Sequence, residues 1–247
     1  MRHAKKSLQE YKMSKIVIIF GAGCSVASGA PLMNNFIDKG DKLAYDNPDS
    51  IDIQSFNLVK KARQELQRGS IKSNIDIHNI EDFFTAFELA SVFGQLGDLD
   101  QSNIDNLSIA MKKFIIQTIE NSITYKLEKG FIRPHSEFNT IANFIHSLLD
   151  KKIIKNLSEI TLITFNYDLN LEIALHYNNI PFSYSFSEET NIDCLKVLKL
   201  HGSINWAKDQ NNNINEVLRI KDIMNSPQHI RQNRIPIRLS NNISINL

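Results

Sequence analysis

Cysteine is scarce in this 247-residue chain, which has only Cys24 and Cys194. Two cysteines cannot form a four-cysteine zinc site, and two alone make no disulfide framework in a chain of this length. We therefore expect a reduced, cytoplasmic protein without a bound metal ion.

Long hydrophobic runs and an excess of one charge are also lacking. The first apolar run covers residues 16–20, shorter than the core of about 7 to 15 residues in a signal peptide. No run approaches the roughly 18 apolar residues of a membrane helix. The net charge is +1, which provides no basic field for a phosphate backbone. The sequence thus predicts no membrane insertion and argues against nucleic acid as a partner.

The composition is that of a globular protein, with 42% hydrophobic and 22% charged residues. The length suits one domain with a large insertion, or two small domains. We interpret residues 1–14 as a polar N-terminal extension and residues 15–206 as the main domain. Residues 207–247 form an Asn-rich polar tail, or a truncated remainder of that domain, in which only residues 235–239 are strand-like.

Apolar runs predict the strands of an α/β fold. Residues 15–20 read KIVIIF, which is typical of a central strand buried on both faces of a parallel sheet. Further apolar strands are predicted at 160–165 and 195–200, an alternating strand at 182–186, and a short helix at 169–177. This alternation favours a sheet with helical crossovers.

A helical module is predicted between the first two strands. A helix over 56–68 precedes it. After Asn79, apolar residues recur at helical spacing to Phe93, and the period resumes at Ile104 and continues to Gly130. Pro134 opens a further helix that ends near residue 148. We therefore expect a helical insertion at about 79–150, with Phe83, Phe87, Phe114 and Ile119 buried.

A glycine-rich turn directly follows the first strand, at Gly21, Ala22, Gly23, Cys24 and Ser25, with Gly29, Ala30 and Pro31 soon after. Such a turn lets backbone N–H groups approach a pyrophosphate. The GxGxxG fingerprint is incomplete because Val26 occupies its third glycine position, and no P-loop lysine is present. A tight turn without a ligand is the alternative.

Short polar side chains follow the strand at 160–165. Thr164, Asn166 and Asp168 stand where ligands of open α/β sheets bind, outside the carboxyl ends of the strands. The alternative for Asp168 is that it caps the helix starting at Leu169.

Directly after the predicted strand at 195–200 come His201, Gly202 and Ser203. A histidine titrates near neutrality and can serve as a general base, and the glycine lets the backbone pass close to a substrate. Of the seven histidines, only His201 combines a predicted strand end with an adjacent glycine.

Taken in order, the strings GAGCSVASGAP, ITFNYD and LKLHGS resemble the sirtuin superfamily, specifically the silent-information-regulator-like domains of bacterial antiphage defence NAD hydrolases. The resemblance implies a Rossmann-like, NAD-binding parallel sheet over residues 15–206, with a helical insertion in place of a zinc module. It implies that Asn166 contacts the nicotinamide ribose, that Asp168 lies beside it and that His201 is the catalytic base. The implied cofactor-binding residues are Gly21, Ala22, Gly23, Cys24, Ser25, Pro31, Thr164, Asn166, Gly202 and Ser203.

Three departures bear on the activity. The Asp-Phe-Arg element of the deacylases is missing after Pro31, and so is their four-cysteine zinc module, which disfavours protein deacylation. No glycine-serine element follows Trp206, so the domain is expected to be C-terminally incomplete. The resemblance favours an NAD hydrolase that depletes NAD in antiphage defence, acting as a homo-oligomer or with a defence-system partner. The rival readings are a non-catalytic NAD-binding or oligomerisation module and, less favoured, the nucleotide-binding domain of an oxidoreductase.

Overall fold

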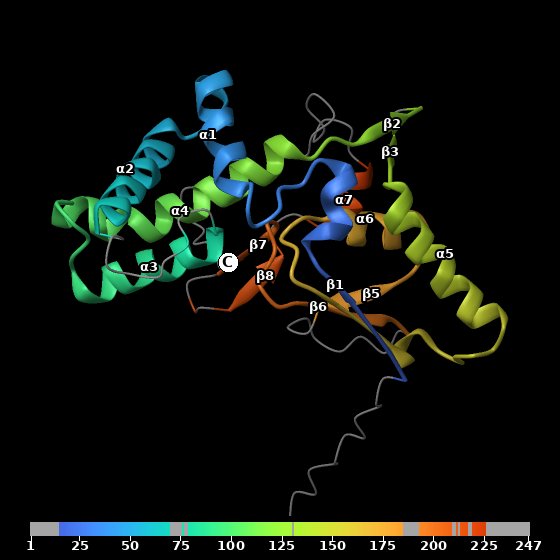
Figure 1. Cartoon of the computed structure of the whole chain (residues 1–247). Helices are drawn as coiled ribbons and strands as arrows, with labels where there is room; N and C mark the ends of the chain where they lie inside the picture. The colour runs from blue at the N-terminus through green and yellow to red at the C-terminus, as the bar shows by residue number, and fades with distance from the viewer. Residues whose placement is uncertain are drawn as a thin grey trace, which may run out of the picture.

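The computed structural model of the chain describes residues 15–69, 76, 79–129, 131–184, 193–208, 211, 213–216 and 219–225. A parallel sheet with two helices on one face forms one end of the molecule, and a cluster of four helices forms the other (Figure 1). The predicted extension at 1–14 and the strand-like residues 235–239 lie outside the described residues.

The sheet consists of β1 (Ile16–Phe20), β4 (Ile160–Thr164), β6 (Leu195–Lys199) and β5 (Phe182–Tyr184), in the order β1-β4-β6-β5. All neighbouring pairs are parallel. Phe20 is in register with Thr164, and Thr164 with Lys199. This register brings the segments that follow β1, β4 and β6 to one edge of the sheet, and the predicted α/β, Rossmann-like fold is confirmed.

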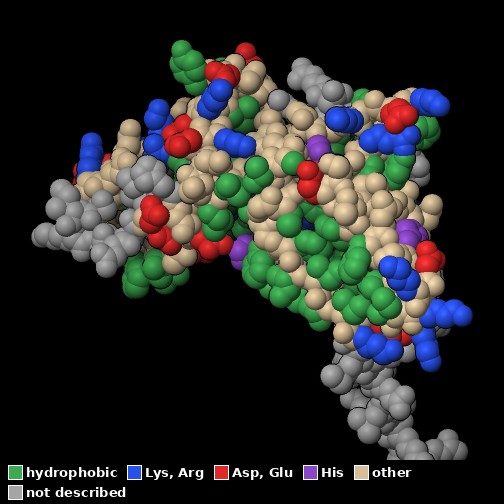
Figure 2. Space-filling model, turned by 45° about the vertical axis from the view of Figure 1, so that its right-hand side comes forward, with side chains coloured by type: hydrophobic (Ala, Val, Ile, Leu, Met, Phe, Trp, Pro, Cys, Tyr) green, Lys and Arg blue, Asp and Glu red, His purple; other side chains and the backbone are tan. Residues whose placement is uncertain are grey.

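The prediction that β1 is a central strand buried on both faces was wrong. Within the described residues β1 pairs with β4 alone and forms an edge of the sheet. Its Val17 and Ile19 side chains are 52% and 64% exposed. Figure 2 shows hydrophobic side chains gathered over this end of the molecule. The continuous apolar run of β1 therefore does not correspond to a strand that is buried on both faces.

The face of the sheet opposite to Val17 and Ile19 is covered by α5 (Ser136–Asp150) and α6 (Asn170–Tyr177). Between α5 and β4 the chain forms the 3-10 turn η4 (Leu157–Glu159). Leucine and isoleucine side chains of β4 and β6 pack there with the apolar stripe of α5, which includes Phe138, Ala142 and Ile145. This stripe has the spacing that the sequence predicted.

The second core lies among α1 (Phe36–Asp46), α2 (Ile53–Gly69), α3 (Ile80–Phe93) and α4 (Gln101–Ser122), with the turn η2 (Pro48–Ser50) between α1 and α2. The helices α1, α2 and α3 all pack against α4. The expected burial of Phe83, Phe87, Phe114 and Ile119 is confirmed, since each is at most 3% exposed.

The helical cluster does not coincide with the expected insertion at about 79–150. It begins earlier, with α1, and α5 packs on the sheet instead. The helix predicted to continue to Gly130 ends at Ser122, where the chain turns so that Thr124 N–H donates to Ser28 O. A hairpin of β2 (Lys126–Glu128) and β3 (Phe131–Arg133) follows. The helical spacing of Leu127 was coincidental, because this side chain is 43% exposed in β2.

Residues beyond 206 are more than a polar tail. β7 (Trp206–Lys208) pairs with β8 (Ile214–Glu216), and α7 (Ile220–Asn225) packs against α6 and β3, with Ile220, Ile223 and Met224 buried. The buried apolar side chains of α7 thus make this segment part of the folded domain.

In the part of the chain that the structure describes, none of the helices has the length and apolar character needed to cross a bilayer.

Candidate functional site

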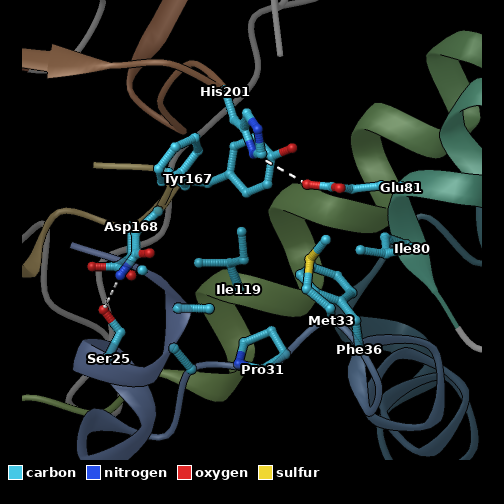
Figure 3. Close-up of a pocket in the computed structure, with 15 residues that line it drawn as sticks. Ser25, Pro31, Met33, Phe36, Ile80, Glu81, Ile119, Tyr167, Asp168 and His201 are labelled. Atoms are coloured by element: carbon cyan, nitrogen blue, oxygen red, sulfur yellow. Dashed lines mark hydrogen bonds and ion pairs between the residues drawn. The ribbon is translucent and has the colours of Figure 1, made fainter. Parts of the chain in front are cut away.

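A cavity of about 330 Å³ lies at the carboxyl ends of β1 and β4, where the sheet meets the helical cluster. In Figure 3, Ser25 and Asp168 line one side and Glu81 the other, with Tyr167 and His201 along the top. Its wall includes apolar residues of the glycine-rich segment and the helical cluster: Ala30, Pro31, Met33, Phe36, Ile80 and Ile119. Its size falls within the usual range of ligand pockets.

The glycine-rich turn continues as a 3-10 helix, η1 (Ala22–Ser28), which ends at Gly29. Gly29 has φ +98°, and a Cβ there would overlap the carbonyl oxygen of Ser122 in α4. Glycine at this position therefore lets η1 lie against the end of α4. The predicted residues Gly21, Ala22, Ser25 and Pro31 line the cavity, whereas Gly23 and Cys24 are not among its lining residues.

Asn166 is fixed in the cavity wall by two neighbours. Its Nδ2 donates to Ser25 Oγ at 2.9 Å, and its backbone N–H donates to Thr164 Oγ1 at 3.0 Å. Thr164 thus supports Asn166 and does not itself line the cavity. The side-chain oxygen Oδ1 of Asn166 is buried and has no hydrogen-bond partner among the described residues. A buried acceptor without a partner is costly in a folded protein, so it marks a position for a ligand donor.

Asp168 lines the cavity, and it also caps the following helix, which the sequence analysis offered as the alternative role. Its Oδ1 accepts a hydrogen bond from Asn170 N at 3.0 Å, at the first residue of α6. The side chain of Asn170 donates in turn to Ser28 Oγ at 2.9 Å. Asp168 therefore connects the cavity wall to the start of α6.

His201 lies at the upper rim of the cavity, directly after β6. The next residue, Gly202, has φ +89°, a conformation that favours glycine. The imidazole packs against the edge of Phe165, with ring centroids 5.2 Å apart, and against Tyr167 at 5.9 Å. Its Nδ1 is 3.5 Å from Glu81 Oε1.

The last two predicted residues lie away from this cavity. Gly202 lines a neighbouring hollow of about 500 Å³, which shares Ile80, Glu81, Tyr167 and His201 with the first cavity. Ser203 is buried and donates to Asn205 Oδ1 at 2.7 Å. Its position indicates a structural role below the His201 loop.

Two site residues were missed by the sequence analysis. Glu81 lies in the first turn of α3, a segment that the sequence analysis considered only for its apolar spacing after Asn79. Tyr167 stands inside the ITFNYD string but was not singled out. Burial, together with the Glu81 carboxylate, raises the pKa of the Tyr167 hydroxyl to about 12, so it stays protonated near neutral pH. The position of Tyr167 between Asn166 and Asp168 was the feature of the sequence that could have identified it.

A buried ion pair supports the loop that carries Asn166 and Asp168. Lys199, at the end of β6, lies 2.9 Å from Glu172 Oε1 in α6, and its Nζ also donates to the carbonyl oxygen of Asp168. Both side chains are at most 1% exposed. This pair ties the end of β6, two residues before His201, to the loop after β4.

The residues that line the cavity offer partners for the parts of NAD. The backbone of Gly21 and Ala22, the open acceptor of Asn166 and the apolar wall offer partners for phosphate, ribose and a flat ring respectively. Within the ranges that the structure describes, no group of three His, Cys, Asp or Glu side chains is arranged to hold a metal ion.

A family model described as a SIR2-like domain matches residues 160–241. The match includes Asn166, Asp168 and His201, and it extends beyond residue 206. Among curated proteins, none matches the chain significantly. The ITFNYD and LKLHGS strings both lie within this match, so residues 160–241 are similar to a SIR2-like domain, in agreement with the parallel sheet.

Proposed function

We propose that this protein hydrolyses NAD at the bond between nicotinamide and ribose, giving nicotinamide and ADP-ribose. The observation that supports this most is that one cavity is lined by the glycine-rich turn, Asn166 and His201, although these lie up to 180 residues apart in sequence (201 − 21). Sirtuin-like domains use NAD, which favours this substrate over other nucleotides.

In the reaction, the bond between the nicotinamide nitrogen and ribose C1′ breaks, and its electron pair leaves with nicotinamide. The oxygen of a water molecule bonds to C1′ and releases one proton. Asn166 Oδ1 accepts a hydrogen bond from a ribose hydroxyl or the water and so orients it. His201 takes the proton, directly from the water or through a ribose hydroxyl. Asp168 keeps the neighbouring loop in place.

The remaining lining residues bind the rest of the substrate. Backbone groups of the turn from Gly21 to Ser25 receive the pyrophosphate, with Ser25 also holding Asn166. The apolar wall formed by Pro31, Met33 and Phe36 suits the nicotinamide ring, and it limits the access of bulk water to C1′.

Incubation of the purified chain with NAD, followed by chromatographic detection of nicotinamide and ADP-ribose, tests the proposal. We expect His201→Ala and Asn166→Ala each to lower the rate by about 100-fold or more. Cys24→Ala is the control, because Cys24 does not line the cavity, and its effect should be small. Wild-type protein that binds NAD without cleaving it, with both variants binding equally well, would instead support the non-catalytic module.

We further propose that NAD depletion serves antiphage defence in the bacterial cytoplasm, with the chain acting as a homo-oligomer or with a partner protein. The family resemblance is the support for this role. Cells expressing the wild-type gene should lose NAD after phage infection, whereas cells expressing His201→Ala should keep it. Equal NAD levels in the two cultures would contradict the role.

A further inference from the structure

The helical cluster contributes an acidic side chain to the histidine of the candidate site. Glu81 Oε1 of α3 lies 3.5 Å from His201 Nδ1, and the two residues face each other in Figure 3. Among the described residues, Glu81 is the one acidic residue whose carboxylate lies within 4 Å of a His201 ring nitrogen. The contact joins segments 120 positions apart (201 − 81).

The position of Glu81 is well determined by its helix. Asn79 Oδ1 accepts a hydrogen bond from Glu81 N at 2.9 Å and caps α3. Ile80 and Phe83 on either side are 3% and 1% exposed, because they are buried in the core of the helical cluster. In the first turn of a helix a carboxylate is favoured by the helix dipole. The backbone that carries Glu81 is therefore fixed by the packing of α3 on α4, and the carboxylate reaches His201 from there with its side chain 48% exposed.

Within the described residues, the other side chains around the imidazole contact its ring or have partners of their own. Phe165 and Tyr167 contact the ring through their aromatic faces or edges. Lys199, the last residue of β6 and two positions before His201, is directed to Glu172 and to the Asp168 carbonyl. A carboxylate beside Nδ1 favours the tautomer in which Nδ1 carries the proton and Nε2 keeps its lone pair.

We propose that Glu81 is a positioning residue for His201: its carboxylate accepts a hydrogen bond from Nδ1–H of the imidazole, orients the ring and leaves Nε2 as the base. The kinetic consequence rests on the proposed NAD hydrolysis, whereas the tautomer itself does not. The helical cluster then has a function in catalysis besides covering the cavity.

Nitrogen-15 NMR of the histidine rings in the labelled full chain tests the tautomer without any substrate. The His201 signals are those that disappear in His201→Ala. We expect the neutral His201 ring of the wild type to be protonated at Nδ1. In Glu81→Gln we expect a shift toward Nε2–H. Glu88→Gln is the matched control, because Glu88 lies two turns further along α3 and accepts from Ser108 Oγ; it should leave the His201 signals unchanged.

NAD cleavage by the same variants tests the kinetic consequence. Glu81→Gln should lower kcat by about 10- to 100-fold, the usual effect of losing the partner that orients a functional histidine, with KM changed less than about twofold. Glu81→Asp should recover part of kcat, and Glu88→Gln should match the wild type. An Nε2–H tautomer in the wild type, or equal kcat in Glu81→Gln, would overturn the proposal. Absence of cleavage in the wild type, with the expected tautomer shift, would contradict only the proposed hydrolysis.

Discussion

Asn166 and Ser25 lie 141 positions apart in sequence and share a hydrogen bond of 2.9 Å inside the cavity wall. A second bond of the same kind joins Asn170 to Ser28, also at 2.9 Å. The two asparagines are four residues apart and the two serines three, so the segment after β4 and the 3-10 helix η1 are connected at two successive points. These bonds hold the glycine-rich turn against the loop that carries the polar residues.

We expect Ser25→Ala to lower the rate of NAD cleavage by about 10- to 100-fold, because Asn166 loses the bond that orients it. Ser28→Ala is the matched control: it releases Asn170, which does not line the cavity, so it should lower the melting temperature with less effect on rate. Initial rates and thermal melts of both variants provide the comparison. A wild-type rate in Ser25→Ala would show that the orientation of Asn166 does not depend on this bond.

Gly40 and Phe114 form a tightly packed contact in the helical cluster, where a Cβ on Gly40 would overlap the Phe114 ring. Phe114→Ala should cost about 3 to 5 kcal/mol of unfolding free energy, because this side chain is 1% exposed and packs on Phe56. Gly40→Ala should destabilise the wild type by about 1 to 3 kcal/mol through overpacking. In the Phe114→Ala background the same change should stabilise, since it fills space and favours helix.

Urea unfolding of the four proteins in this cycle measures these effects. Phe93→Ala is the control for removing a phenylalanine side chain that is not buried, because Phe93 is 76% exposed at the end of α3. It should change the free energy of unfolding by no more than about 0.5 kcal/mol. The packing interpretation fails if Gly40→Ala has the same sign of effect in both backgrounds.

The buried pair of Lys199 and Glu172 should behave as a unit. Lys199→Met leaves the Glu172 carboxylate buried without its cation and should cost about 3 to 5 kcal/mol. Adding Glu172→Gln removes the buried charge and keeps an acceptor for the Tyr184 hydroxyl, which lies 3.1 Å from Glu172 Oε1. The double variant should therefore be more stable than Lys199→Met, as measured by denaturant unfolding. A double variant less stable than Lys199→Met would contradict the pairing.

Glu216 should make the stability depend on pH near neutrality. Burial, with the nearby Glu172 carboxylate, raises its pKa from 4.5 to about 7 in the folded chain. Between these values the folded state holds a proton that the unfolded state has released, so the free energy of unfolding contributed by Glu216 falls as pH rises from about 4.5 to about 7.

Glu216→Gln removes this dependence and keeps an acceptor for Asn205 Nδ2, which lies 3.1 Å away. We expect the variant to gain stability relative to the wild type between pH 5 and pH 8, as measured by urea unfolding at both values. Carboxylates that do not interact with Glu216 contribute equally to the two proteins and cancel in the difference. A stability difference that is the same at both pH values would show that Glu216 titrates normally.

Much of the fold follows from local patterns. Apolar runs predict β1, β4 and β6, and alternation predicts β5, because a strand needs only a few consecutive residues that can pack on a neighbour. The start of α3 is equally local, since Asn79 caps the helix two residues before Glu81. Candidate site residues could be predicted because the carboxyl ends of parallel strands meet at one edge, which places Asn166 and His201 together once the strands are known.

Other features depend on contacts between distant parts of the chain. An apolar run has the same sequence at the edge of a sheet as at its centre, so the exposure of Val17 and Ile19 depends on which strands pair with β1. The end of α4 at Ser122 likewise reflects the bond from Thr124 to Ser28, not the apolar spacing that continues to Leu127. The contact of Glu81 with His201 exists because Ile80 and Phe83 bury α3 against α4, and no spacing within α3 indicates that partner. Local sequence thus specifies strands and helix caps, whereas the summed packing of distant side chains selects the residues that face each other across the cavity.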